Sequence, residues 1–321
     1  MAKKQNISSK KNQQLKKVPK ESPLYNYSLI FLFSVFIILF TTFKISGDDD
    51  IFWHLATGRH IVEAQDIPST DIFGYVTQGQ QWVNVEWGWG VLTFALYEIG
   101  GYAAISVLRT IIFLLIFFLL FLILRKFKIS FTLIFMFFII LSFGIMDRLS
   151  ARPHILSYLF LTLLLFIITE YKYFNFNRDK SKSKILFFIP LIFLIWANVH
   201  LGVMAGLFLF GIFVLSETIV FFNSGKFTNK EIAPLTKKDL QKLILIFIIS
   251  MIAILINPFT YLPYYGLFFT SNFESLKSLN EWKSPFDIMF KGRLVILIYK
   301  TFLFAGIIIL YYSYKKKDLF S

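Results

Sequence analysis

The chain has 321 residues, of which 56% are hydrophobic, 19% aromatic and only 16% charged, and its formal net charge at pH 7 is +14. The apolar residues come in long runs rather than at amphipathic spacing, which excludes a soluble globular core and indicates an integral membrane protein. The sequence contains no cysteine, which excludes a disulfide framework and a thiolate metal site.

Eight apolar segments are candidates for membrane-spanning helices, since a helix needs about 20 apolar residues to cross a bilayer. They are residues 27–45, 102–124, 129–146, 155–169, 185–199, 201–222, 243–256 and 294–314. The fourth, fifth and seventh are short, which reduces the expected count by about one helix. The sequence therefore predicts an all-α polytopic membrane domain of about eight transmembrane helices over residues 27–314.

The distribution of basic residues predicts the orientation. Most of the 33 Lys and Arg residues lie in segments 1–26, 125–128, 172–184, 223–242 and 315–321, which alternate with segments that hold far fewer. Cationic loops resist translocation, so both termini are predicted to be cytoplasmic. The positive charge is then explained by topology, and no nucleic acid is expected. The basic segment 1–26 is expected to be disordered, where it can touch anionic lipid.

Polar and aromatic residues collect in the predicted outer loop between the first two spans, residues 47–101. We expect a juxtamembrane helix over Asp50–Ala64, a loop over 69–81 and a second helix over 82–97 that ends before Gly100 and Gly101. With this orientation, every histidine and tryptophan of the chain falls on or near the outer face. These residues are His54, His60, His154, His200, Trp53, Trp82, Trp87, Trp89, Trp196 and Trp282. The outer face is therefore the predicted functional face.

A family resemblance rests on strings spread over most of the chain. With x for any residue, they are DxDxFWHLATGRxIV, IPxTDxFGY, WVNVEWGW, ARPHILSYL, WANVHLG and EWKSP, from Asp48 to Pro285. Together with a first span that ends in an acidic cluster before a long outer loop, they resemble the GT-C superfamily of polytopic glycosyltransferases, and within it an uncharacterised bacterial branch. The resemblance implies a bacterial plasma (inner) membrane protein. The family's shared module has seven spans, and this chain has one predicted span after it, which leaves open a truncated member.

The resemblance implies transfer of a sugar from a polyprenyl-phosphate or polyprenyl-diphosphate donor to a hydroxyl acceptor, by an inverting mechanism of the hexosyltransferase type. The family's acidic residue after the first span acts as a general base or binds a metal, and the matching positions here are Asp48 and Asp50. Mg or Mn is the divalent cation that these two carboxylates could share. On a helix that begins at Asp50, His54 and Thr57 lie on the same face. The alternative is that the acidic residues 48–50 only cap this helix.

Two further acids, Asp71 and Glu86, are flanked by aromatic and apolar residues. Either carboxylate could orient the acceptor or share a cation with Asp48 or Asp50. The alternatives are structural: Asp71 can bond its own backbone in a turn, and Glu86 can pair with Arg59 or a lysine.

Arginines are the candidates for the donor phosphate, because a guanidinium matches phosphate oxygens and keeps its charge when partly desolvated. Arg109 lies seven residues inside the second span, where an ionisable side chain usually faces a cavity or a partner, although snorkelling is feasible. Arg148 and Arg152 lie four residues apart and could hold a phosphate or pair with Asp147. Arg59 and Arg293 are weaker candidates.

Histidine spacing does not favour a metal site. His54 and His60 lie six residues apart, and no pair stands at i, i+3 or i, i+4. His200 is expected to bond backbone or substrate. Two other classes of function stay open: a non-catalytic assembly partner of the same fold, and a transporter or flippase for lipid-linked sugars. A polysaccharide polymerase is a third alternative, within the enzymes. In each case membrane lipid is an expected partner.

Overall fold

The structure, a computed structural model, describes residues 22–42, 49–175, 180–223, 235–269, 284, 286–287 and 292–315. Its α-helices are α1 Pro23–Thr42, α2 Asp50–Ala64, α3 Trp87–Lys126, α4 Phe131–Gly144, α5 His154–Thr169, α6 Phe188–Ala197, α7 Val203–Phe222, α9 Lys237–Ala253, α10 Leu262–Phe269 and α12 Leu294–Lys315. Short 3₁₀ segments cover Met146–Arg148 and Lys180–Phe187, and a π-helix covers Glu170–Asn175. Within the described residues, β-type pairing is confined to an isolated bridge between Thr70 and Gln81. The all-α class predicted for this chain therefore agrees with the described residues.

Five of the described helical segments are long and apolar enough to cross a membrane. They are Pro23–Thr42, Trp87–Lys126, His154–Phe174, Val203–Phe222 and Leu294–Ser313. The segments Phe131–Gly144 and Lys184–Ala197 are apolar but shorter, and α9 has 17 residues and begins with charged side chains. Of the eight predicted spans, five thus correspond to helices of spanning length, and the other three correspond to the shorter helices α4, α6 and α9.

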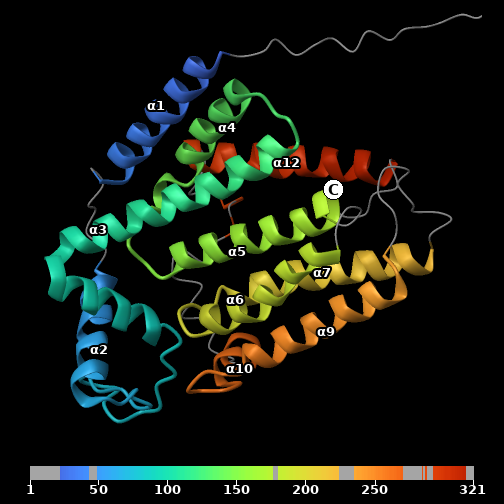
Figure 1. Ribbon diagram of the computed structural model, residues 1–321. Coiled ribbons are helices and arrows are strands. Elements are labelled where there is room, and N and C mark those ends of the chain that lie inside the picture. Colours follow the sequence, from blue (N-terminus) through green and yellow to red (C-terminus); the bar gives the residue numbers. More distant parts are fainter. Residues whose placement is uncertain are drawn as a thin grey trace, which may run out of the picture.

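The helices are arranged as a bundle that places distant parts of the chain side by side (Figure 1). In the figure, α5, α6, α7 and α9 run nearly parallel, and α3 packs against α5 and α1, while α12 packs on α4. Because α2 packs against the first part of α3, it lies at one end of this bundle. The start of α5 and the turn between α6 and α7 lie at the same end, which we call the α2 end.

Helix α3 contains a break that separates its two roles. Gly101 has φ +59° and ψ −151°, a conformation that only glycine adopts readily, and Gly100 is also non-helical. The residues before the break pack on α2, and those after it form the long apolar part of the helix. The break agrees with the predicted boundary between the second outer-loop helix and the second span, and Figure 1 shows the resulting bend.

The second predicted helix of the outer loop begins five residues later than expected, at Trp87 rather than at residue 82. The residues before Trp87 form loop hydrogen bonds and not helical ones. Trp82 N donates to Ser69 O, and Glu86 N donates to the side-chain oxygen of Asn84. A short polar side chain that bonds the backbone two residues on competes with helix formation.

The fourth predicted span was expected to end at Thr169, but its helix continues to Asn175 in π geometry. The charged residues that suggested an end are buried and paired. Glu170 pairs with Lys126 of α3, and Lys172 Nζ lies 3.0 Å from Glu217 Oε1 of α7. Lys172 is therefore part of the bundle, not of the predicted linker 172–184.

Candidate functional site

Helix α2 presents a polar buried face at the α2 end of the bundle. Asp50 is in its first turn, and His54 and Thr57 follow on the same side, both with less than 2% of their surface exposed. This confirms the predicted helix and the shared face. The predicted cap is not formed by Asp49, whose side chain makes no capping hydrogen bond, and Asp48 lies outside the described residues.

A close approach of two glycines brings the start of α3 onto this face. A Cβ atom on Gly58 would lie 2.1 Å from the carbonyl oxygen of Gly90, and one on Gly90 would lie 3.0 Å from the carbonyl oxygen of His54. Only residues without a side chain allow the two backbones to come this close. Glu86, directly before α3, is thereby held beside α2.

The turn between α6 and α7 docks on the same start of α3 through Asn198. The Asn198 carbonyl oxygen accepts from Gly88 N at 3.1 Å, and its side-chain oxygen accepts from Trp87 Nε1 at 3.2 Å. A Cβ atom on Gly88 would lie 2.5 Å from that carbonyl oxygen, so this contact also needs glycine. The docking places His200 opposite Glu86.

Glu86 is the centre of the resulting group of side chains. One carboxylate oxygen, Oε2, lies 3.7 Å from His54 Nε2, and the other, Oε1, lies 3.7 Å from His200 Nε2. These separations are longer than a hydrogen bond, so neither ring is bonded to the carboxylate in this state. The Glu86 side chain keeps 21% of its surface exposed and is therefore within reach of a small group.

An ion pair lies close to Glu86. Arg152 Nη2 is 3.0 Å from Asp50 Oδ2, and the two side chains are 29% and 43% exposed. The sequence did not predict that Arg152 and Asp50 pair with each other. We call Asp50, His54, Glu86, Arg152 and His200 the Glu86 cluster.

The electrostatics of the cluster set the charge of two members. Burial raises the pKa of Glu86 to about 7; the negative charge of Asp50 adds to this increase, and the positive charge of Arg152 opposes it. Burial lowers the pKa of His200 to about 4, with a further contribution from His154. Near neutral pH, His200 is uncharged and Glu86 is close to half protonated. A carboxyl group that titrates near neutrality is suited to accept and return a proton.

Two further residues belong to this site: Ser157, which carried no signal in the sequence, and Trp196, which the sequence marked only as one of the tryptophans of the outer face. Ser157, on the first turn of α5, lies with its Oγ 2.7 Å from His200 Nδ1, and it accepts a hydrogen bond from Trp196 Nε1 at 2.7 Å. A serine or tryptophan inside an apolar helix is usually a packing residue. Ser157 and Trp196 come close to His200 only because α5 and α6 pack against each other.

Other predicted site residues lie outside the cluster. Asp71 is partly exposed, and it accepts bonds from the Thr77 hydroxyl and from the backbone of Gly74 and Phe73, which together hold its pKa below the usual range. This is the structural alternative predicted for it, a turn that the carboxylate stabilises. Arg148 contributes its backbone carbonyl oxygen, which lies 3.1 Å from His154 Nε2.

Arg109 is 3% exposed and bonds to backbone rather than to the cluster. Its Nη1 donates to Leu149 O at 3.1 Å, and its Nη2 donates to Thr41 O at the end of α1. The guanidinium thus has the partners expected of an arginine inside a membrane protein, and it joins α1, α3 and the segment before α5.

Asp48 and Asp50 are the two carboxylates that the sequence suggests could share a divalent cation. Among the described residues, no group of three or more His, Cys, Asp or Glu side chains could hold a metal ion. Asp48 falls outside that part of the chain. The ion pair of Asp50 with Arg152 gives that carboxylate a cationic partner already.

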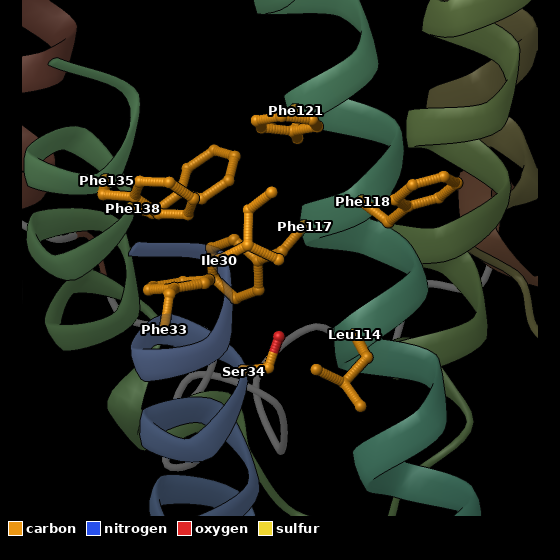
Figure 2. A pocket seen from close by; sticks show the side chains of 9 residues that line it. All are labelled: Ile30, Phe33, Ser34, Leu114, Phe117, Phe118, Phe121, Phe135 and Phe138. Carbon is orange, nitrogen blue, oxygen red and sulfur yellow. The ribbon is translucent and has the colours of Figure 1, made fainter. Parts of the chain in front are cut away.

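An apolar cavity of about 130 Å³ lies between α1, α3 and α4, and none of the cluster residues lines it (Figure 2). Its lining consists of Ile30, Phe33, Ser34, Leu114, Phe117, Phe118, Phe121, Phe135 and Phe138. Ser34 contributes the single polar side chain of this lining. The cavity suits hydrocarbon, and its lining offers no acid or base.

Comparisons with known proteins find no matching family model, no matching curated protein and no matching solved structure.

Proposed function

We propose that the chain is a membrane glycosyltransferase that moves a sugar from a polyprenyl-phosphate or polyprenyl-diphosphate donor to a hydroxyl acceptor at the α2 end of the bundle. The observation that carries the proposal is Glu86, a largely buried carboxyl group with a pKa near 7, beside the partly exposed pair of Asp50 and Arg152. The positive-inside asymmetry of the loops supports an extracytoplasmic position for this end, in a bacterial plasma membrane.

Glu86 is the general base of this proposal. The acceptor hydroxyl gives its proton to the Glu86 carboxylate as its oxygen attacks the anomeric carbon, and the bond from that carbon to the phosphate oxygen breaks on the opposite side. The polyprenyl phosphate leaves with the bonding electrons, so the configuration at the anomeric carbon is inverted. A base with a pKa close to the working pH combines a useful deprotonated fraction with sufficient basicity.

Arg152 is the group that meets the donor phosphate. Its guanidinium has five N–H donors in a planar fork, is 29% exposed and lies 3.0 Å from Asp50 Oδ2. Phosphate accepts such donors well, and the positive charge stabilises the leaving group as its negative charge develops. Asp50 then orients Arg152, which is a different role from the general base expected from the sequence.

Donor binding and sugar transfer test the proposal with purified protein in nanodiscs. Labelled polyprenyl-phosphate sugars are offered with a panel of hydroxyl acceptors, with EDTA or with added Mg²⁺ or Mn²⁺. Arg152→Gln is expected to weaken donor binding, whereas Glu86→Gln is expected to bind donor and lose transfer. Glu63→Gln, an exposed acid on α2, is the matched control and should behave like the parent.

The pattern of outcomes separates the proposed function from its alternatives. Transfer by Glu86→Gln at the parent rate contradicts the role of the base. Absence of saturable binding for every lipid-phosphate sugar contradicts the enzyme and favours a non-catalytic assembly partner. Movement of the lipid-linked sugar between leaflets without transfer favours the flippase.

A further inference from the structure

Three hydrogen bonds converge on one side of the His200 ring. Trp196 Nε1 donates to Ser157 Oγ at 2.7 Å, Ser157 Oγ lies 2.7 Å from His200 Nδ1, and the backbone N–H of Gly202 donates to the same Nδ1 at 3.0 Å. Trp196 is fully buried and Ser157 is 7% exposed, so water does not compete for these groups.

The donors in this arrangement leave one assignment of the protons. An indole N–H and a backbone N–H can only donate, so Trp196 directs its proton at Ser157, and Gly202 directs its proton at His200 Nδ1. Nδ1 therefore carries no proton, and the hydroxyl proton of Ser157 points to it as well. A neutral imidazole has one ring proton, which must then sit on Nε2.

The glycine at position 202 is a requirement of this geometry. A Cβ atom there would lie 2.4 Å from Ser157 Oγ and 2.7 Å from His200 Nδ1. A side chain would separate the hydroxyl from the ring, so the backbone at Gly202 is shaped to let the two polar atoms meet.

We propose that the backbone N–H of Gly202, together with Ser157 and Trp196, fixes His200 in its Nε2–H tautomer, so that His200 is a positioning residue that presents a proton donor to the carboxylate of Glu86. The Nε2 atom lies 3.7 Å from Glu86 Oε1. A hydrogen bond needs an approach of less than 1 Å, and catalytic hydrogen bonds are often long before substrate binds. This inference deepens the proposed function, on which its catalytic meaning rests, while the tautomer itself does not depend on any reaction.

The tautomer has a chemical consequence for the site. A ring with Nδ1 as an acceptor cannot ligate a metal through Nε2 without losing its last proton, whereas metal-binding histidines normally donate from their other nitrogen. His200 is also no base toward Glu86. Its role is to stabilise the carboxylate form, in which Glu86 can take the acceptor proton.

Several charged or titratable groups face Glu86, and those that are not varied must be held constant in any test. Asp50 and His54 face it from α2, Arg152 from the segment before α5, and His200 from the turn between α6 and α7. His154 acts on His200.

The tautomer is measured directly by ¹⁵N NMR of histidine-labelled protein in nanodiscs at pH 7. The chain has four histidines, so the signal of His200 is assigned by its loss in His200→Phe. We expect a neutral ring with protonated Nε2. A ring protonated on Nδ1, or a positively charged ring at pH 7, overturns the proposal.

The effect on Glu86 is measured by infrared titration of its carboxyl band, assigned by Glu86→Gln. His200→Phe removes the polar Nε2–H group that lies 3.7 Å from the carboxylate and is expected to raise the midpoint of this band by roughly half a pH unit, since the contact is longer than a full hydrogen bond. Ser157→Ala leaves the Gly202 donor in place, so it is expected to weaken the preference for the Nε2–H tautomer and to raise the midpoint less. Ser157→Thr retains the hydroxyl and should show the parent's His200 tautomer and Glu86 midpoint.

The control is Ser142→Ala, since Ser142 is a fully buried serine of α4 that bonds only the carbonyl of Phe138 within its own helix. It should leave both the tautomer and the Glu86 midpoint unchanged. An unchanged midpoint in folded His200→Phe contradicts the positioning role. None of these measurements uses a donor or an acceptor, so a failure of the proposed glycosyl transfer is recognised separately.

Discussion

Arg152 Nη2 lies 3.0 Å from Asp50 Oδ2, which joins the residue before Pro153 and α5 to the first turn of α2. About a hundred residues of sequence separate the two side chains. Both charges act on the pKa of Glu86, which Asp50 raises and Arg152 lowers. The pair therefore connects the position of α2 with the electrostatics of the cluster.

A double-mutant cycle of Asp50→Asn and Arg152→Gln tests this connection. Because both side chains are partly exposed, the coupling in the free energy of unfolding is expected to be small, on the order of 0.5–1 kcal/mol. The effect on transfer is expected to be larger, roughly 10- to 100-fold for each single variant, since a misplaced guanidinium no longer meets the phosphate. Transfer losses that simply multiply in the double variant would show that the two residues act independently.

The stability of the folded chain is expected to depend on pH through Glu86. Its folded-state pKa, about 7, is above the ordinary value of 4.5, so the folded state binds the proton more tightly than the unfolded state. This contribution is fully present below pH 4.5 and is lost as the pH rises to about 7, by up to about 3 kcal/mol. In Glu86→Gln this loss should disappear, as measured by detergent-induced unfolding at a series of pH values.

His200 acts in the opposite direction over part of the same range. Its pKa is lowered from 6.5 to about 4, so the unfolded state binds more protons between these values and stability rises with pH. In Glu86→Gln we therefore expect stability to increase from pH 4 to 6.5, and in His200→Phe to decrease between pH 4.5 and 7. Parallel pH curves for the parent and both variants would contradict the two assigned shifts.

The sequence was sufficient for those elements of this fold that local rules govern. Helix α2 has the predicted bounds, because an acidic start and a continuous helical composition are local signals, and the break before residue 102 follows from two adjacent glycines. The end of α5 could not be predicted in this way. Charged side chains usually end a span, and here Lys172 is accommodated by Glu217, a partner on α7 that only the folded structure supplies.

In the candidate site, too, the residues could be predicted from the sequence, whereas their contacts could not. Asp50, His54, Glu86, Arg152 and His200 were all proposed from the sequence, because ionisable residues among apolar ones are conspicuous. Their pairing depends on helix crossings, so their roles could not be assigned in advance. Arg109 was a phosphate candidate by its depth in the membrane, yet its Nη1 and Nη2 donate to the carbonyl groups of Leu149 and Thr41.

Arg109→Leu is therefore expected to reduce stability rather than donor affinity. The substitution leaves two carbonyl groups in the bundle without this donor, at about 1–3 kcal/mol for each acceptor that finds no replacement. Arg59→Leu, on the exposed side of α2, is the control and should change the free energy of unfolding by about 0.5 kcal/mol or less. Loss of donor binding in Arg109→Leu protein that is as stable as the parent would instead place a phosphate at this arginine.

Two glycine substitutions with opposite expected signs test whether the contact of α2 with α3 builds the site. In Gly58→Ala the new methyl group would lie 2.1 Å from the carbonyl oxygen of Gly90, and backbone atoms cannot rotate away, so α2 must shift from α3. In Gly211→Ala, on α7, the nearest atom is a Phe247 ring carbon at 3.4 Å, which is ordinary contact, and alanine is favoured over glycine in a helix by about 1 kcal/mol.

Gly58→Ala is expected to lower the free energy of unfolding by about 1–3 kcal/mol and to move Glu86 away from His54. Gly211→Ala is expected to raise it by about 0.5–1 kcal/mol and to leave transfer unchanged. Detergent-induced unfolding measures stability, and the infrared midpoint of Glu86 reports the cluster. Displacement of α2 should lower that midpoint toward the ordinary range, since Glu86 would lose both its burial and the nearby charge of Asp50. A stable Gly58→Ala protein with the parent midpoint would mean that the cluster does not depend on this contact, and that the turn between α6 and α7 alone holds Glu86 in place.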